Sequence, residues 1–208
     1  MSSNKTILHA IAQFISVLFN PLVIPSLGTL MIFHAGNIFN LWPSTVVAWI
    51  VFVISLGTLW LPLVVLQLLK QFQYITDLRM NGMKERILPY TLVLIIFLIT
   101  YFMIRHLIIP DVVDKIILSS CIAIGVNIIF LFYWKISSHA MGAGGLLALS
   151  FVLFLRWQAT NFTLLYLVIL IAGMVCWARL WLEAHTEKQV YAGLSVGFAI
   201  TAFVLSYF

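Results

Sequence analysis

The chain has 208 residues, of which 63% are hydrophobic and only 8% are charged, and its formal net charge is +5. A soluble domain carries roughly a quarter charged residues, so this chain has too little polar side chain to cover a water-exposed globule. Lipid must therefore be the solvent for much of its surface. The 11 Lys and Arg residues are too few for a general nucleic-acid face. They favour a phosphorylated small molecule or anionic lipid headgroups as partners.

Seven apolar runs are candidates for membrane spans, each of which needs about 20 residues of helix. The first, residues 7–33, contains Pro21 and Pro25, so it is either one kinked span or an interfacial helix followed by a span. The spacers between runs are short and no repeat is visible, which indicates one domain over residues 1–208. We predict an all-α polytopic bundle of six or seven spans. The other six runs are residues 44–69, 87–104, 112–134, 140–155, 161–182 and 190–208.

Three polar spacers, residues 70–86, 135–139 and 179–189, hold most of the side chains able to do chemistry. They lie between spans two and three, four and five, and six and seven. Two crossings separate each spacer from the next, so all three are expected at the same membrane face, whatever the first run does.

The end of the first polar spacer carries three cations within eight residues, Arg79, Lys84 and Arg86, just before an apolar run. Arg presents a planar fork of donors and Lys a point charge, and both suit phosphate oxygens. The plainer alternative is a solvated positive anchor at the end of a membrane helix.

The second polar spacer ends in Ser137, Ser138 and His139 and leads into a new helix. The first turn of a helix exposes backbone N–H groups that favour an anion. A histidine at that position suits a general acid. The alternative is an ordinary serine cap beside an interfacial histidine.

The third polar spacer begins with Arg179, which belongs to an apolar run close to its end, and continues to His185 and Gln189. A guanidinium inside a membrane is costly unless it meets an anion or a water-filled cavity, so Arg179 is a functional candidate, with snorkelling to the interface as the alternative. His185 and Gln189 are four residues apart and share a face if the segment is helical. The Gln carbonyl can then hold the imidazole in one tautomer.

Together the three spacers resemble the type 2 phosphatidic acid phosphatase superfamily, whose signature is Lys-x6-Arg-Pro, Pro-Ser-Gly-His and Ser-Arg-x5-His-x3-Asp. Arg179, His185 and Gln189 reproduce the spacing of the third motif. Two residues depart from it: Ala178 stands in place of the serine, and Gln189 in place of the aspartate that orients the histidine.

The other two motifs are matched less completely. Ser137 and His139 fit the second motif, with Ser138 in place of its glycine. The first motif is matched in spacing by Arg79 and Arg86, with Lys84 as a second candidate for the lysine role.

The resemblance implies a two-step phosphatase mechanism that needs no metal or other cofactor. His185 would attack phosphorus to form a phosphohistidine, and His139 would protonate the leaving oxygen before water releases phosphate. Surrounding the phosphate oxygens would be Arg79 or Lys84, Arg86, Arg179, Ser137 and the Ser138 backbone N–H.

The substrate implied is a lipid phosphate monoester or diphosphate, such as phosphatidate, phosphatidylglycerol phosphate or a polyprenyl diphosphate. The location implied is a bacterial plasma membrane, crossed several times. Two alternatives stay open: a non-catalytic transporter or binding protein for anionic lipids, and a phosphotransferase that passes the group from His185 to an acceptor other than water. Lys and Arg are commoner on the motif face, which the positive-inside rule would place in the cytoplasm. Several of them are candidate phosphate ligands, so the orientation stays open.

Overall fold

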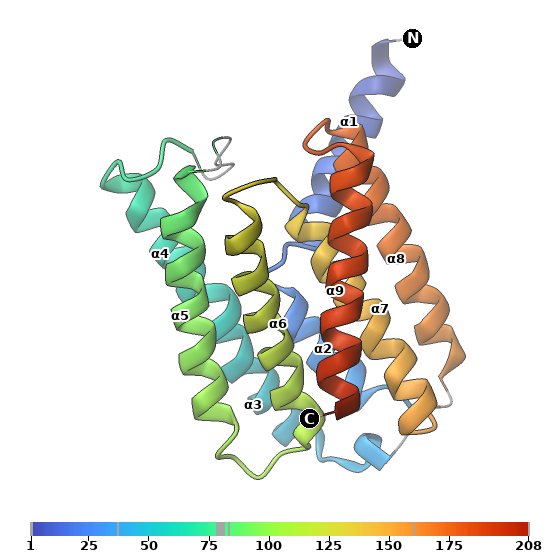
Figure 1. Ribbon diagram of the computed structural model, residues 1–208. Coiled ribbons are helices and arrows are strands. Elements are labelled where there is room, and N and C mark those ends of the chain that lie inside the picture. Colours follow the sequence, from blue (N-terminus) through green and yellow to red (C-terminus); the bar gives the residue numbers. More distant parts are fainter. Residues whose placement is uncertain (1, 37, 78–81, 83, 160, 208) are drawn as a thin grey trace.

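The computed structural model describes residues 2–36, 38–77, 82, 84–159 and 161–207, without the side chains of residues 2–4 and 84. In these ranges the protein is a helical bundle and no strand is present (Figure 1). Six helices are long and apolar enough to cross a membrane, which confirms an all-α, multi-pass fold. They are Ser44–Gln71 (α3, the π-helical turn η2 and α4), α5 (Ile87–Ile104), α6 (Asp111–Phe130), α7 (Ser138–Arg156), α8 (Phe162–Trp181) and α9 (Glu187–Tyr207).

The first of these spans changes its winding part-way along. α3 (Ser44–Ser55) passes into η2 (Leu56–Trp60) and then α4 (Leu61–Gln71) without a break in direction. Pro62 has no N–H to give to the carbonyl four residues earlier, and a wider turn just before it accommodates that missing bond. Two short 3₁₀ turns complete the described elements: η1 (Ile38–Leu41) and η3 (Lys84–Arg86).

The first apolar run forms two shorter helices, α1 (Ser2–Leu18) and α2 (Ile24–Phe33). The chain breaks around Asn20 and Pro21, where the Asn20 side chain accepts from Leu22 N at 3.0 Å and its carbonyl accepts from Val23 N at 2.8 Å. These local bonds satisfy the unwound backbone. Because the break redirects the chain, α1 packs against α8, whereas α2 packs against α3, α6 and α7. The two termini lie at opposite ends of the bundle (Figure 1).

The centre of the bundle is α7, the most enclosed of the long helices. It packs closely against α9 because glycines remove the side chains that would keep the two backbones apart. A Cβ on Gly144 would overlap the carbonyl oxygen of Leu194, and one on Gly197 would overlap that of Met141. This contact fixes the start of α7 against the start of α9, where the second and third motifs lie.

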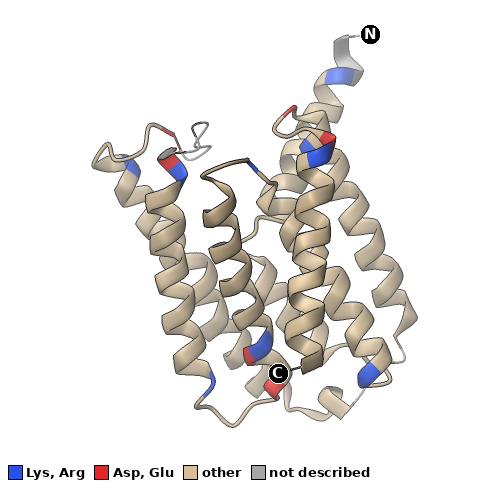
Figure 2. Ribbon diagram, viewed as in Figure 1, with Lys and Arg blue, Asp and Glu red and all other residues tan. Residues whose placement is uncertain are grey.

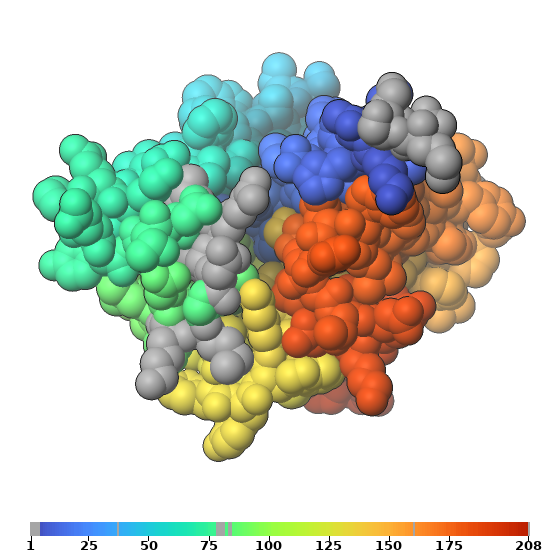
Figure 3. All heavy atoms as spheres, turned by 90° about the horizontal axis from the view of Figure 1, so that it is seen from above, coloured from blue at the N-terminus to red at the C-terminus, as the bar shows by residue number. Residues whose placement is uncertain are grey.

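Charged residues gather at the two ends of the bundle, with a band of uncharged helix between them (Figure 2). The connections from α4 to α5, from α6 to α7 and from α8 to α9 all lie at one end, as the parity of crossings predicts (Figure 1). Viewed onto that end, the surface is hollowed between the blue N-terminal helix, the green α4–α5 segment and the orange-red α8–α9 segment (Figure 3). The described parts of the three polar spacers therefore border one hollow.

Candidate active site

His185 lies in the loop that joins α8 to α9. α8 ends at Trp181 and is followed by Glu183 in the left-handed region (φ 50°), and the turn is closed by a bond from Ala184 N to Arg179 O at 3.2 Å. This turn brings His185 back against the bundle, where only 9% of it is exposed. Its Nδ1 lies 3.2 Å from Oε1 of Gln189, in the first turn of α9. The predicted pairing of His185 with Gln189 is present.

The tautomer of His185 follows from a second hydrogen bond to the same Gln189 oxygen. The backbone N–H of Thr186 donates to Oε1 at 3.1 Å, so the amide oxygen is the atom that faces both groups. An amide oxygen only accepts, and Nδ1 of His185 therefore carries the ring proton. In the neutral ring Nε2 keeps its lone pair, which makes it the nucleophilic atom. The bond from Thr186 N to the Gln189 side chain is one half of a capping box at the start of α9, so this orientation is built into the helix start.

Arg179 lies in the last turn of α8, below His185. Its Nη1 donates to the Ser16 hydroxyl of α1 at 3.3 Å. Its Nε is buried and has no hydrogen-bond partner among the residues that the structure describes. A buried guanidinium N–H without a partner is costly, which makes Arg179 the strongest single indication of an anion site here.

His139 occupies the first turn of α7 and is held by α1. Its Nε2 lies 3.0 Å from the backbone oxygen of Ser16, which only accepts, so Nε2 carries the proton of the neutral ring. Proton exchange with a ligand is then left to Nδ1. Ser16 consequently contacts both His139 and Arg179, one through its backbone and the other through its hydroxyl.

The two serines of the second motif hold the local structure. The Ser137 hydroxyl accepts from Ala140 N at 3.4 Å and caps α7, and Ser137 N donates to the Gln189 backbone oxygen at 3.2 Å. That second bond joins the second motif directly to the third. The Ser138 hydroxyl accepts from the Asn127 amide at 2.8 Å and pairs with the Tyr90 hydroxyl at 2.9 Å. The structure thus provides the cap that the plainer interpretation of Ser137 expects, and a phosphate-binding role for either serine stays a prediction.

The site gathers several cations around His185. Burial, and then the positive charge of Arg179, lower the pKa of His185 from 6.5 to about 4, against the opposing hydrogen bond from Gln189. Burial also lowers the pKa of Lys135, and the charges of Arg86 and Arg179 lower it further. Every charged group that acts on either pKa is a cation. The site therefore favours an anion, and His185 is neutral at neutral pH.

The structure brings together His185, Gln189, His139, Arg179 and Arg86. Of the remaining candidates, Arg79 and the side chain of Lys84 lie outside the described residues. No cluster of three or more His, Cys, Asp or Glu residues able to hold a metal is found in the described part of the chain. Residues that the sequence did not single out are Ser16, Tyr90 and Asn127; a polar Asn127 inside an apolar run is the one visible signal.

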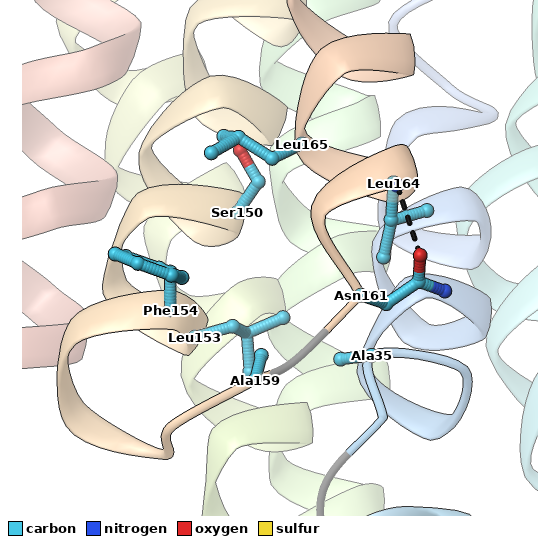
Figure 4. A pocket seen from close by; sticks show the side chains of 8 residues that line it. All are labelled: Ala35, Ser150, Leu153, Phe154, Ala159, Asn161, Leu164 and Leu165. Atoms are coloured by element: carbon cyan, nitrogen blue, oxygen red, sulfur yellow. Dashed lines mark hydrogen bonds between the residues drawn. The ribbon is translucent and has the colours of Figure 1, made fainter.

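A separate small cavity of about 10 Å³ lies between α7 and α8 at the opposite end of the bundle (Figure 4). Its polar side chains already have partners: the Ser150 hydroxyl donates to Leu147 O, and Asn161 caps α8 through Leu164 N and donates to His34 O. The volume holds about one water molecule, so this cavity is structural.

No protein-family model, curated protein or solved structure matches this chain. The resemblance to the lipid phosphatases therefore depends on the motif residues and on the way they lie around one hollow.

Proposed function

We propose that this protein is a membrane-embedded phosphohydrolase that removes phosphate from a lipid phosphate through a phosphohistidine intermediate. The supporting observation is a buried, neutral His185 with its Nδ1 proton held by Gln189, set beside Arg179, whose buried Nε has no hydrogen-bond partner among the described residues. This arrangement supplies a nucleophilic lone pair and a place for phosphate oxygens next to each other.

In the first step, Nε2 of His185 attacks phosphorus and the bond from phosphorus to the lipid oxygen breaks. The leaving oxygen takes a proton from His139. Because Nε2 of His139 is bonded to Ser16 O, Nδ1 is the ring atom left to exchange this proton. In the second step, water attacks phosphorus and gives a proton to His139, the bond from phosphorus to Nε2 of His185 breaks with its electron pair returning to the ring, and inorganic phosphate leaves.

Arg179 and Arg86 hold the equatorial oxygens in both steps, as expected for a reaction that concentrates negative charge on them. The unpartnered Nε of Arg179 is the clearest donor available for one of these oxygens. Lys135 adds positive charge from the α6–α7 loop. Gln189 orients His185 without stabilising an imidazolium, so the charge of the covalent intermediate rests on the phosphate and its cations.

The substrate we propose is a lipid phosphate monoester or diphosphate in a bacterial plasma membrane. The site lies at the end of an apolar bundle, where a headgroup and a hydrocarbon chain meet different solvents. Phosphatidate, phosphatidylglycerol phosphate and polyprenyl diphosphate all have this character.

The test is release of inorganic phosphate by purified protein from a panel of these three lipids, with and without vanadate. We expect vanadate-sensitive release from at least one lipid, and its loss in His185→Ala. His106→Ala is the matched control, because His106 is exposed at the other end of the bundle.

The outcomes separate the proposal from its alternatives. Binding of lipid phosphate with no release from any lipid would establish a transporter or binding protein. Transfer of the phosphoryl group to a lipid acceptor in preference to water would establish a phosphotransferase. Release at the wild-type rate by His185→Ala would exclude His185 as the nucleophile.

A further inference from the structure

A second cavity, of about 300 Å³, lies between α2 and α8. Its volume is at the lower end of the range for small-molecule sites. Phe19 after the end of α1, Leu146 of α7 and Leu167 and Ile171 of α8 contribute to its lining, and among the described residues His34 is the one lining residue with a polar side chain. The Nδ1 of His34 lies 2.9 Å from Leu30 O, within the same helix. The cavity is therefore an apolar groove.

The groove is a consequence of the break between α1 and α2. α1 packs along the upper part of α8, but after Asn20 the chain turns and α2 packs against α3, α6 and α7 instead. The lower part of α8 consequently has no close helical neighbour on this side, and the groove fills the space between. A straight helix through residues 7–33 would have closed it.

The groove is aligned with the candidate active site. Leu146 is seven residues after His139 on α7, which places both on one helix face about 10 Å apart. Ile171 is eight residues before Arg179 on α8, about 12 Å along the axis, and Leu164 continues the lining to about 22 Å. Phe19 follows Ser16, the contact of both His139 and Arg179, by one turn. The groove therefore starts about 10 Å from the phosphate site and leads away from it.

We propose that this groove holds the hydrocarbon chain of the lipid whose phosphate occupies the site, an inference that rests on the proposed function. A polar occupant would lose its hydration without gaining hydrogen bonds there. The position of the groove also sets a minimum length for the hydrocarbon chain. The chain must extend more than about 10 Å from the phosphate to enter the groove and about 22 Å to fill it.

The groove contributes orientation more than affinity. Lipid chains are as apolar as the groove wall, so moving a chain from the bilayer into it yields little hydrophobic free energy. Dispersion contacts instead hold the chain in one direction, which aims the phosphate at Nε2 of His185. We expect the groove to raise kcat/KM for lipids whose chains are long enough to enter it, and to have no effect on kcat/KM for lipids with shorter chains.

The binding test uses two probes with the same long alkyl chain and a photoactivatable group at its end, one a phosphate ester and the other the free alcohol. In lipid nanodiscs, the phosphate probe should label Leu146, Leu164 or Leu167 and should be displaced by vanadate. Equal labelling of these positions by the alcohol, with no effect of vanadate, would show ordinary bilayer lipid in the groove and would overturn the proposal.

The kinetic test uses two leucines of α8. Leu167 lines the groove and is half-exposed, whereas Leu170 is more exposed and is not part of the lining. Leu167→Trp should lower kcat/KM for a long-chain alkyl phosphate about tenfold or more and leave a short-chain one unchanged. Leu170→Trp should alter neither.

These outcomes are distinguishable from failure of the proposed function. If wild-type protein releases phosphate but Leu167→Trp treats long and short chains alike, the groove assignment is wrong and the phosphatase stands. If no lipid is hydrolysed, labelling that depends on the phosphate still supports the groove as a chain site, and labelling without that dependence refutes it.

Discussion

The sharpest prediction concerns the acidic limb of the pH profile and its dependence on Gln189. His185 acts as a nucleophile only when neutral, so kcat/KM should fall as pH drops through the pKa of its free-enzyme form. That pKa is lowered to about 4, first by burial and then by the charge of Arg179. Gln189→Glu keeps the length of the side chain but puts a carboxylate where the amide oxygen now lies, 3.2 Å from Nδ1.

The size of the change can be worked from these values. The drop from 6.5 to about 4 corresponds to roughly 3 kcal/mol at about 1.4 kcal/mol for each pH unit. An opposite charge at this distance favours the imidazolium and moves a pKa by about 1 to 3 units, so the variant should titrate between about 5 and 7. At a pH of about 5.5 the wild type keeps nearly all of its neutral His185, whereas the variant loses much of it.

The measurement is kcat/KM for one lipid phosphate, for both proteins, from a pH below the wild-type pKa of His185 up to neutral pH. The substrate ionises identically in the two profiles, so the difference between them isolates the side chain. The ring-proton NMR titration of His185 in labelled protein gives the same pKa without any reaction.

One result would refute this account of the site. If the wild-type profile already falls near pH 6.5 and Gln189→Glu leaves it there, then His185 is neither desolvated nor coupled to residue 189. If the wild-type profile falls near pH 4 and the variant profile falls at the same pH, His185 is desolvated as described but is not coupled to residue 189.

Three further predictions use other parts of the structure. After an alkaline denaturing quench during turnover with a lipid whose phosphate is radiolabelled, label should stay on wild-type protein and be absent from His185→Ala. Ser16→Ala removes the hydroxyl that holds Arg179 and should lower kcat about tenfold with little change in thermal stability. Ser16→Thr keeps a hydroxyl and should restore most of the lost kcat. A large fall in the melting temperature of Ser16→Ala would make Ser16 a packing residue instead. Gly197→Ala should destabilise the bundle by about 1–3 kcal/mol because its Cβ would overlap the α7 backbone, while Gly173→Ala, with no atom within 4 Å of the added carbon, should be neutral or slightly stabilising in the same thermal melt.

The spans and their order could be predicted from the sequence because apolar runs of about 20 residues have few other uses. Counting membrane crossings was then enough to predict that the three polar spacers lie at one end of the bundle. An even number of crossings separates each spacer from the next, and this number does not depend on how the helices pack. The pairing of His185 with Gln189 followed from their separation of four residues. That spacing holds here because Thr186 starts α9 and places Gln189 in its first turn.

The tertiary contacts of α1 could not be predicted. The run over residues 7–33 left open a kinked span or two helices, and nothing in it marks Ser16 as a contact of His139 and Arg179. Such contacts depend on where the break at Asn20 directs the chain, which the neighbouring helices decide. Ser138 illustrates the same limit: the sequence places its hydroxyl at a helix start, but Asn127 and Tyr90, which engage it, come from two other helices.

The break between α1 and α2 connects the two halves of the proposed function. It lets α1 stay on α8, so that Ser16 holds His139 and Arg179 in place, and it turns α2 away, so that the groove opens below them. A rigid, continuous helix could satisfy one of these requirements but not both, because the same residues would have to contact α8 along its whole length. Unwound backbone at membrane depth needs its polar groups satisfied, and here the side chain and carbonyl of Asn20 accept from Leu22 N and Val23 N. The short unwound segment around Asn20 is therefore the structural element that sets the distance between the phosphate site and the chain groove.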